Sequence, residues 1–196
     1  MPTQPGLRMH FSYHIFRLRQ NIPCAVQIQK TASIVRTALP TLRPHELTAV
    51  LLQYAGTNVA AADLDSFYCT AQEHAHALLP KCSLQQVADI SWALHRAQAT
   101  VPTAFYQHVA EFAAVWLKKQ LNEGKTWLVS EPAHPGTPSL TLSSLSGQTP
   151  GRETAMEAAN FLYRVSQIAD VRPFLKHGVI KGMLRIVSEG AVHVRL

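Results

Sequence analysis

The pattern of hydrophobic and polar positions recurs along this chain at a nearly constant spacing. Residues 38–47 align with residues 78–87 at an offset of 40, and further along the offset falls to 38. The aligned positions are apolar in both copies or proline in both copies: Leu39 on Leu79, Pro40 on Pro80, Leu47 on Val87, Phe67 on Phe105 and Tyr68 on Tyr106. A repeat of this period is typical of proteins that stack one short structural unit.

Each unit is predicted to contain two helices. In the clearest unit, Ser83 and Gln86 form a capping box that begins the first helix, and apolar residues follow at spacings of three and four. The preceding unit has Pro44 at the start of its first helix and Asp63 as the cap of its second. Residues 28–39 have the pattern of a lone second helix. Because each apolar stripe needs a neighbour to cover it, we expect the units to stack.

A stretch rich in Gly, Pro, Ser and Thr interrupts this pattern at residues 122–151 and is predicted to be a loop. After it, Leu162 aligns with Trp92 and Val179 with Val109 at an offset of 70. We therefore expect an all-α fold, a short α-solenoid of stacked helix-turn-helix repeats. The predicted parts are a basic N-terminal arm (1–23), helical-hairpin repeats (24–121), a loop insertion (122–151), and a C-terminal helical hairpin with a tail (152–196).

Positive charge is concentrated at the two ends of the chain. The 196 residues carry a net charge of +6, and the first acidic residue is Glu46. Residues 46–121 hold four cations against six acids, whereas residues 152–196 hold seven cations against four acids. Contact with phosphates is the sequence-independent part of nucleic-acid binding. The candidate RNA-binding residues are therefore Arg8, Arg17, Arg19, Lys30, Arg36 and Arg43 near the N-terminus, and Arg172, Lys176, Lys181 and Arg185 near the C-terminus.

No catalytic or metal-binding pattern stands out in the sequence. Gly124-Lys125-Thr126 does not complete a phosphate loop, because Lys119 stands where that motif needs a glycine. His74 and His76 are two residues apart, so on a helix they point to different faces and are interpreted as core or half-buried histidines. The three cysteines are widely spaced and indicate reduced thiols. We expect no enzyme activity, cofactor, metal or small-molecule substrate, and no stretch is long enough for a membrane span.

The segment Trp92-Ala93-Leu94, inside one repeated unit, resembles the helix of the octotricopeptide repeat of green algae and the related heptatricopeptide repeat of apicomplexan parasites. The resemblance covers residues 24–121 and 152–189, but only this unit has the Trp-Ala-Leu core. It implies import into mitochondria or chloroplasts and association with RNA. In divergent protists, such proteins also serve as accessory proteins of the mitochondrial ribosome.

Together these features predict a non-enzymatic accessory structural protein of a mitochondrial ribosome, located in the matrix. It would contact rRNA through its basic termini and neighbouring ribosomal proteins through its helical faces. Two alternatives stay open: a supernumerary subunit of a mitochondrial membrane respiratory or ATP synthase complex, and an organellar RNA-stability factor. The acid-free arm is equally compatible with a cleaved targeting segment and with a retained RNA contact.

Overall fold

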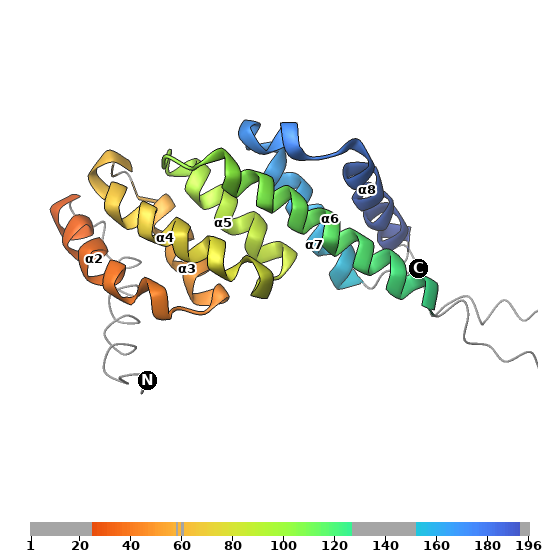
Figure 1. Cartoon of the computed structure of the whole chain (residues 1–196), viewed down its shortest axis with the longest axis horizontal. Helices are drawn as coiled ribbons and strands as arrows, with labels where there is room; N and C mark the ends of the chain where they lie inside the picture. The colour runs from red at the N-terminus through yellow and green to blue at the C-terminus, as the bar shows by residue number, and fades with distance from the viewer. Residues whose placement is uncertain (1–24, 58, 60, 127–151, 193–196) are drawn as a thin grey trace, which may run out of the picture.

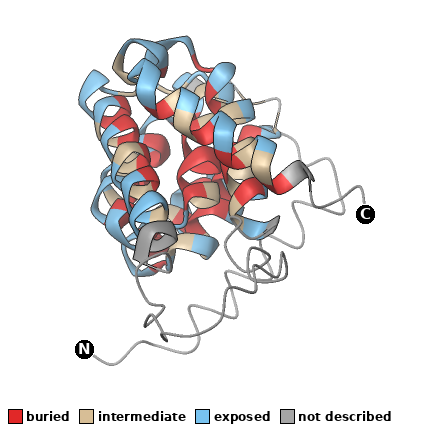
Figure 2. Cartoon of the chain, turned by 90° about the vertical axis from the view of Figure 1, so that its right-hand side faces the viewer, coloured by how far each residue is buried: buried red, intermediate tan, exposed pale blue. Residues whose placement is uncertain are grey.

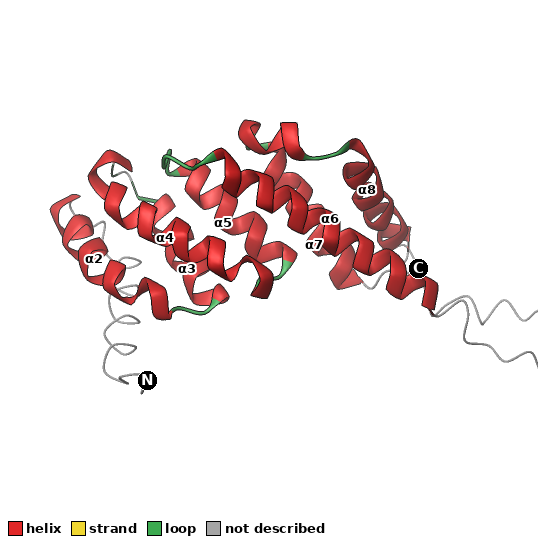
Figure 3. Ribbon diagram, in the orientation of Figure 1, coloured by secondary structure: helices red, strands yellow, loops and turns green. Residues whose placement is uncertain are grey.

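The chain forms helices throughout the part that the structure describes, a computed structural model in which residues 25–57, 59, 61–126 and 152–192 are placed. Figure 1 shows their order and Figure 3 their helical character. The α-helices are α2 (Ala25–Ala38), α3 (Pro44–Ala55), α4 (Asp65–Leu78), α5 (Leu84–Arg96), α6 (Thr103–Thr126), α7 (Arg152–Ser166) and α8 (His177–Val192). Short 3₁₀ helices join them: η1 (Leu39–Thr41), η2 (Ala61–Leu64), η3 (Leu79–Lys81) and η5 (Ala169–Phe174). The predicted all-α class is confirmed for these residues.

Alternate helices pack on one another in two layers. In one layer α3 packs on α5 and α5 on α7; in the other α2 packs on α4 and α6 on α8. The second layer is continuous, because the rings of His76 on α4 and His108 on α6 lie 4.5 Å apart. The helices form a row with α2 at one end and α8 at the other (Figure 1). Buried positions lie on the inner sides of the helices, between the layers (Figure 2).

The turns that end α2 and α4 have the same local structure in two successive units. In each, proline is the second residue of a 3₁₀ turn, in η1 and in η3. The N–H of Leu42 donates to the carbonyl of Leu39 at 3.0 Å, and the N–H of Cys82 donates to that of Leu79 at 3.1 Å. Proline fits here because it lacks the N–H that a continuing helix would need. The same short signal therefore ends both helices.

The helices that follow these turns also begin in a related way. At α5, the Ser83 N–H donates to the Gln86 side chain at 2.9 Å, and the Gln86 N–H donates to the Ser83 hydroxyl at 3.2 Å. This is the predicted capping box. At α3, the Arg43 N–H donates to the Glu46 carboxylate at 2.8 Å. Both first turns thus satisfy a backbone donor that the helix itself leaves free.

The core repeats an aromatic pair. Phe67 and Tyr68 of α4 meet edge to face with ring centroids 5.1 Å apart, and Phe105 and Tyr106 of α6 do so at 5.8 Å. All four side chains are buried, and Tyr54 of α3 lies 4.5 Å from Phe67 across the layers. Edge-to-face contact is a favoured geometry for such rings. Each pair lies within one helix, and the contact between Tyr54 and Phe67 joins α3 to α4.

Two boundary predictions differ from the structure. Asp63 lies inside η2 and does not cap α4, because Leu64 occupies the N-cap position and α4 begins at Asp65. The 3₁₀ turn therefore moves the N-cap, and with it the start of the helix, by one residue. The loop predicted from residue 122 starts later, since α6 continues to Thr126. The segment up to Lys125 contains good helix formers that tolerate the single Gly124.

The alignment of α7 with α5 also differs by one residue from the predicted offset of 70. The buried residues of α7 lie 71 positions after those of α5: Ala155 after Leu84, Ala158 after Val87, Phe161 after Ile90 and Val165 after Leu94. For α8 the offset of 70 holds, with Val179 buried like Val109. Leu162, which aligned with Trp92, is only partly buried, and Tyr163 takes the outward place next to it. The offset therefore changes from 71 to 70 between α7 and α8.

Candidate nucleic-acid interface

The cations predicted to contact RNA fall into two separate groups in the structure. Arg8, Arg17 and Arg19 lie outside the described residues. Among the others, Lys30 and Arg36 lie on α2 and Arg43 directly precedes α3, whereas Arg172 lies in η5, Lys176 just before α8, and Lys181 and Arg185 on α8. Helices α2 and α8 are at opposite ends of the row (Figure 1). The structure therefore does not gather these residues into one patch.

Three of these cations have partners within the chain. Arg43 lies 3.8 Å from the Glu46 carboxylate, and Arg185 lies 2.6 Å from that of Glu189. The Arg172 guanidinium donates to the backbone carbonyl of Ser166. The hydrogen bond and the charge of Glu189 raise the pKa of Arg185, so this side chain stays positive. Lys30, Arg36, Lys176 and Lys181 form no ion pair with the residues that the structure describes.

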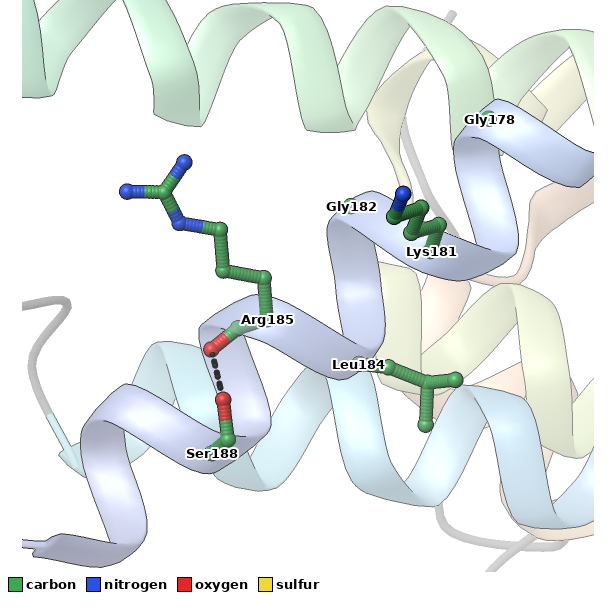
Figure 4. A pocket seen from close by; sticks show the side chains of 6 residues that line it. All are labelled: Gly178, Lys181, Gly182, Leu184, Arg185 and Ser188. Carbon is green, nitrogen blue, oxygen red and sulfur yellow. Dashed lines mark hydrogen bonds between the residues drawn. The ribbon is translucent and has the colours of Figure 1, made fainter.

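The C-terminal group contains an open hollow on α8. Its volume is about 640 Å³, and it is lined by Gly178, Lys181, Gly182, Leu184, Arg185 and Ser188. Figure 4 shows Lys181, Leu184 and Arg185 on consecutive turns of the helix, with the Ser188 hydroxyl donating to the carbonyl of Arg185 at 2.8 Å. Leu184 is 55% exposed. The hollow thus combines two positive charges with one apolar side chain.

The two glycines of the hollow have different surroundings. A Cβ atom at Gly182 would lie 2.6 Å from the Leu117 side chain of α6, so this glycine allows α6 and α8 to approach closely. A Cβ atom at Gly178 would meet nothing within 4 Å. Packing between α6 and α8 therefore explains why residue 182 is a glycine, but it does not explain the glycine at position 178.

A second cluster of cations surrounds Trp92, which the sequence singled out for another reason. The guanidinium carbon of Arg164 lies 4.0 Å from the centre of the Trp92 ring, and that of Arg96 lies 5.1 Å from it. The indole N–H of Trp92 donates to the Gln167 side chain at 2.9 Å. Because Arg164 lies on α7 and Gln167 directly follows it, the tryptophan links α5 to α7. It is part of a helix contact and does not present a free stacking surface.

Asp89 is the charged centre of this contact. It is only 8% exposed, and its Oδ1 lies 3.2 Å from Arg164 Nε without hydrogen-bond alignment, so the pair is held by charge. Its other oxygen accepts from Gln85 at 2.9 Å, and Asn160 of α7 donates to Gln85 at 2.8 Å. The sequence did not predict this role of Arg164. Its one signal was an acid, Asp89, inside the apolar stripe of α5.

The remaining aromatic stripe belongs to the core. Phe105 is buried, and Phe112 and Trp116 are partly buried and packed against the core. Burial raises the pKa of Glu157 on α7, and the neighbouring Trp116 side chain offsets part of this shift. The aromatic side chains therefore contribute to the core and do not form an exposed platform on which bases could stack.

His74, Cys69 and Cys82 have ordinary structural surroundings. A ring nitrogen of His74 lies 3.0 Å from the carbonyl of Leu42, as expected for a half-buried histidine that tethers a turn. Burial raises the pKa of Cys82 to about 11, and burial together with Asp65 and Glu73 raises that of Cys69. Both thiols stay protonated near neutral pH. Within the described residues, no three His, Cys, Asp or Glu side chains are grouped closely enough to hold a metal ion.

The described residues define an all-α protein whose helices pack in two layers, with cations at both ends of the row. No helix in the part of the chain that the structure describes is both long enough and apolar enough to cross a membrane. No family model matches the chain, and neither a curated protein nor a solved structure matches it.

Proposed function

We propose that this chain is a non-enzymatic accessory structural protein of a mitochondrial ribosome. It contacts rRNA through its basic ends and neighbouring proteins through its helical faces. The observation that carries this proposal is the separation of charge. Cations without an ion-pair partner in the described residues lie at the two ends, on α2 and around α8, whereas the segment between them holds more acids than cations. Phosphates are attracted to the ends and not to the middle.

The architecture that best fits this role is a short α-solenoid. The contacts of α3 with α5 and of α5 with α7 run between alternate helices, as stacked helical hairpins require. The recurrence of the Pro40 turn at Pro80, at the equivalent place of the next unit, supports the same arrangement. Exposed apolar side chains along the stack offer contact points for protein neighbours: Val26, Ile34, Val115, Met156, Tyr163 and Leu184.

The mitochondrial location and the ribosome itself rest on the resemblance at Trp92-Ala93-Leu94. The number of repeats adds to the argument. A helical-repeat reader recognises about one base per repeat, and a stack this short would read too few bases for sequence specificity. Contact with the phosphate backbone of an RNA whose position is already fixed, as in a ribosome, needs no such reading.

Sedimentation of the full-length, tagged protein tests the proposal. We expect it to travel with ribosomal particles in a sucrose gradient of mitochondrial lysate and to leave them after ribonuclease treatment. Replacing Lys176 and Lys181 with Gln should weaken this association. The matched control is the same change at Lys81 and Lys118, which are exposed cations of the middle segment. Association that resists nuclease, or equal effects of the two variants, would contradict the proposal.

One observation favours a second candidate, a supernumerary subunit of a mitochondrial membrane complex. On α2, the exposed Val26 and Ile34 flank Lys30 at intervals of four residues, so they share one helical face. A basic face with apolar residues can lie on an anionic lipid surface. Binding to cardiolipin-containing vesicles that is lost in Lys30→Glu, together with nuclease-resistant association, would favour this candidate.

A further inference from the structure

We propose that the hollow on α8 is a binding site for the sugar-phosphate backbone of single-stranded RNA. Lys181 and Arg185 hold two phosphates, and Leu184 packs against the ribose or base between them. This inference rests on the proposed function and makes it specific, because it assigns the C-terminal RNA contact to six residues of one helix. It also separates them from the other C-terminal cations, Arg172 and Lys176.

The spacing of the two cations matches such a strand. Lys181 and Arg185 are four residues apart and lie one turn apart on the same side of α8. Four residues correspond to about 6 Å along a helix axis, comparable to the distance between successive phosphates of an extended strand. Two cations in this register can each contact one phosphate, as an electrostatic groove for single strands requires.

The glycines give the backbone room to approach. Gly178 and Gly182 line the hollow together with Lys181 and Arg185 and add no side chains to this part of α8. Gly182 already serves the contact with Leu117, but no neighbour within 4 Å of a Cβ accounts for Gly178. A glycine inside a helix costs up to about 1 kcal/mol relative to alanine. Close approach of a ligand backbone is a reason to keep it.

The mixed lining favours RNA over other polyanions. The hollow contains one exposed apolar side chain, Leu184, which a sugar or base can cover but which is too small a patch for a lipid surface. An acidic peptide could also satisfy the two charges, so competition with the oligoribonucleotide is part of the test below.

Glu189 reduces the positive charge that the hollow presents to a phosphate. Its carboxylate lies 2.6 Å from Arg185 and competes with a phosphate for that guanidinium. RNA binding must therefore break this ion pair or share the guanidinium between both acids. Removing the carboxylate should strengthen RNA binding, the opposite of what the loss of a structural ion pair would suggest.

The test uses the full-length protein and a fluorescently labelled single-stranded oligoribonucleotide, with binding followed by anisotropy over a range of salt concentrations. The double variant Lys181→Gln/Arg185→Gln should bind roughly 10-fold more weakly, and its log-log salt slope should fall by about 1.4, the value for two phosphate contacts on a single strand. The control Lys81→Gln/Lys118→Gln removes the same charge from the middle segment and should change the affinity far less. Equal losses would overturn the inference.

Two further variants test the geometry without removing a cation. Gly178→Leu fills the hollow where a Cβ meets no neighbour, so the fold should be kept while RNA binding weakens by roughly 5-fold. Glu189→Gln should bind about 3-fold more tightly, whereas the control Glu73→Gln, on the exposed face of α4, should change little. Unchanged binding in Gly178→Leu, or weaker binding in Glu189→Gln, would overturn the site.

The outcomes separate this inference from the proposed function. If the wild-type chain binds RNA and the α8 variants bind equally well, the hollow is not the site, although contact through the α2 end would stand. If the wild-type chain binds no RNA, both proposals fail. If anionic vesicles or an acidic peptide compete fully with the oligoribonucleotide at equal charge concentration, the hollow is a general anion site and the assignment to RNA is wrong.

Discussion

The two sides of α5 pack against their neighbours in different ways. Towards α3 the contact is largely apolar: the buried side chains of α3 are Leu47, Val50, Leu51, Tyr54 and Ala55, with Thr48 satisfied by the carbonyl of Pro44. Towards α7, the contact adds the ion pair of Asp89 and Arg164 and the hydrogen bond from Trp92 to Gln167. Helix α5 thus has an apolar interface with α3, the apolar joint, and a partly polar interface with α7, the polar joint.

The difference reflects how the chain reaches each joint. Short turns connect α3 to α5 through α4, so the position of α3 is already restricted by the chain. Helix α7 follows α6 only after residues 127–151, and short connections do not limit its position. Apolar contacts tolerate sliding, whereas hydrogen bonds and ion pairs require defined geometry. The ion pair and the hydrogen bond of the polar joint therefore determine how α7 is aligned along α5, because the long connection does not restrict this alignment.

The largest effect is expected when a buried side chain is removed from either joint. Phe161→Ala on α7 should destabilise the protein by about 3–5 kcal/mol and Leu51→Ala on α3 by about 2–5 kcal/mol, because both side chains are completely buried. Denaturant unfolding measures the loss, and hydrogen exchange locates it. We expect Phe161→Ala to lower protection mainly in α7 and α8. Uniform loss of protection along the chain would mean that the two joints form one cooperative unit.

Alkaline pH should weaken the N-terminal side of the molecule before the C-terminal side. Burial raises the pKa of Tyr68 and of Tyr106 to about 12, and raises that of Tyr54 as well. In the unfolded chain these hydroxyls ionise near pH 10, so the unfolded state loses its protons first. The stabilisation is complete below pH 10 and is lost as the pH rises towards 12. After allowing for solvent screening, we expect about 1–2 kcal/mol for each tyrosine.

Hydrogen exchange can show which helices lose stability at alkaline pH. Helices α7 and α8 contain one tyrosine, Tyr163, which is 64% exposed. Hydrogen exchange at pH 7 and at pH 10.5 should therefore show protection falling in α3, α4 and α6 first. Tyr68→Phe should reduce this pH dependence. A loss that begins in α7 and α8 would show that the polar joint, and not the buried hydroxyls, limits stability at high pH.

Breaking the ion pair of the polar joint should have an intermediate effect. Arg164→Leu leaves the Asp89 carboxylate buried without its charged partner and should cost about 1–3 kcal/mol, less than the roughly 3–5 kcal/mol of a fully buried pair, because Arg164 is 27% exposed. Adding Asp89→Asn should recover part of the loss, and a double-mutant cycle in urea measures the coupling. Arg96→Leu removes only the more distant guanidinium and serves as the control. No coupling between Asp89 and Arg164 would mean that apolar contacts alone position α7.

The smallest effect is expected at the start of α5, which both joints share. Ser83→Ala removes the acceptor for the Gln86 N–H and should cost about 1 kcal/mol. Glu46→Gln, at the position of α3 equivalent to Gln86 of α5, keeps an acceptor for the Arg43 N–H and should change stability by less than about 0.5 kcal/mol. Thermal unfolding of both variants compares them. A larger loss in Glu46→Gln would show that the charge at Glu46, and not the backbone hydrogen bond, matters at this helix start.

Much of the local structure could be predicted because short signals decide it. The capping box at Ser83 and Gln86 and the lone helix with buried Ile28, Ala32 and Val35 are confirmed by the structure. Each depends on residues within one or two turns of one another. The alignment of α7 was wrong by one residue because Leu162 and Phe161 are both apolar. The pattern alone therefore cannot decide which of them faces the core.

The candidate site was predictable only in part. The sequence located the cations Lys181 and Arg185 but could not show that they share a hollow, because the hollow depends on Gly178 and Gly182 and on the distance between α6 and α8. The role of Arg164 was missed for a similar reason. Its partner Asp89 lies far earlier in the chain, on the other side of the long connection, and comes close only when α7 packs on α5.

The sequence by itself determined the helices, the turns that end them and the segregation of charge to the two ends, because hydrogen bonds within one turn and the spacing of apolar residues are local properties. The tertiary structure alone decided which side of α7 is buried, that Arg164 pairs with Asp89, and how closely α6 approaches α8 at Gly182. These features depend on side chains from distant segments meeting, and the free energy of those contacts exists only once the helices have packed.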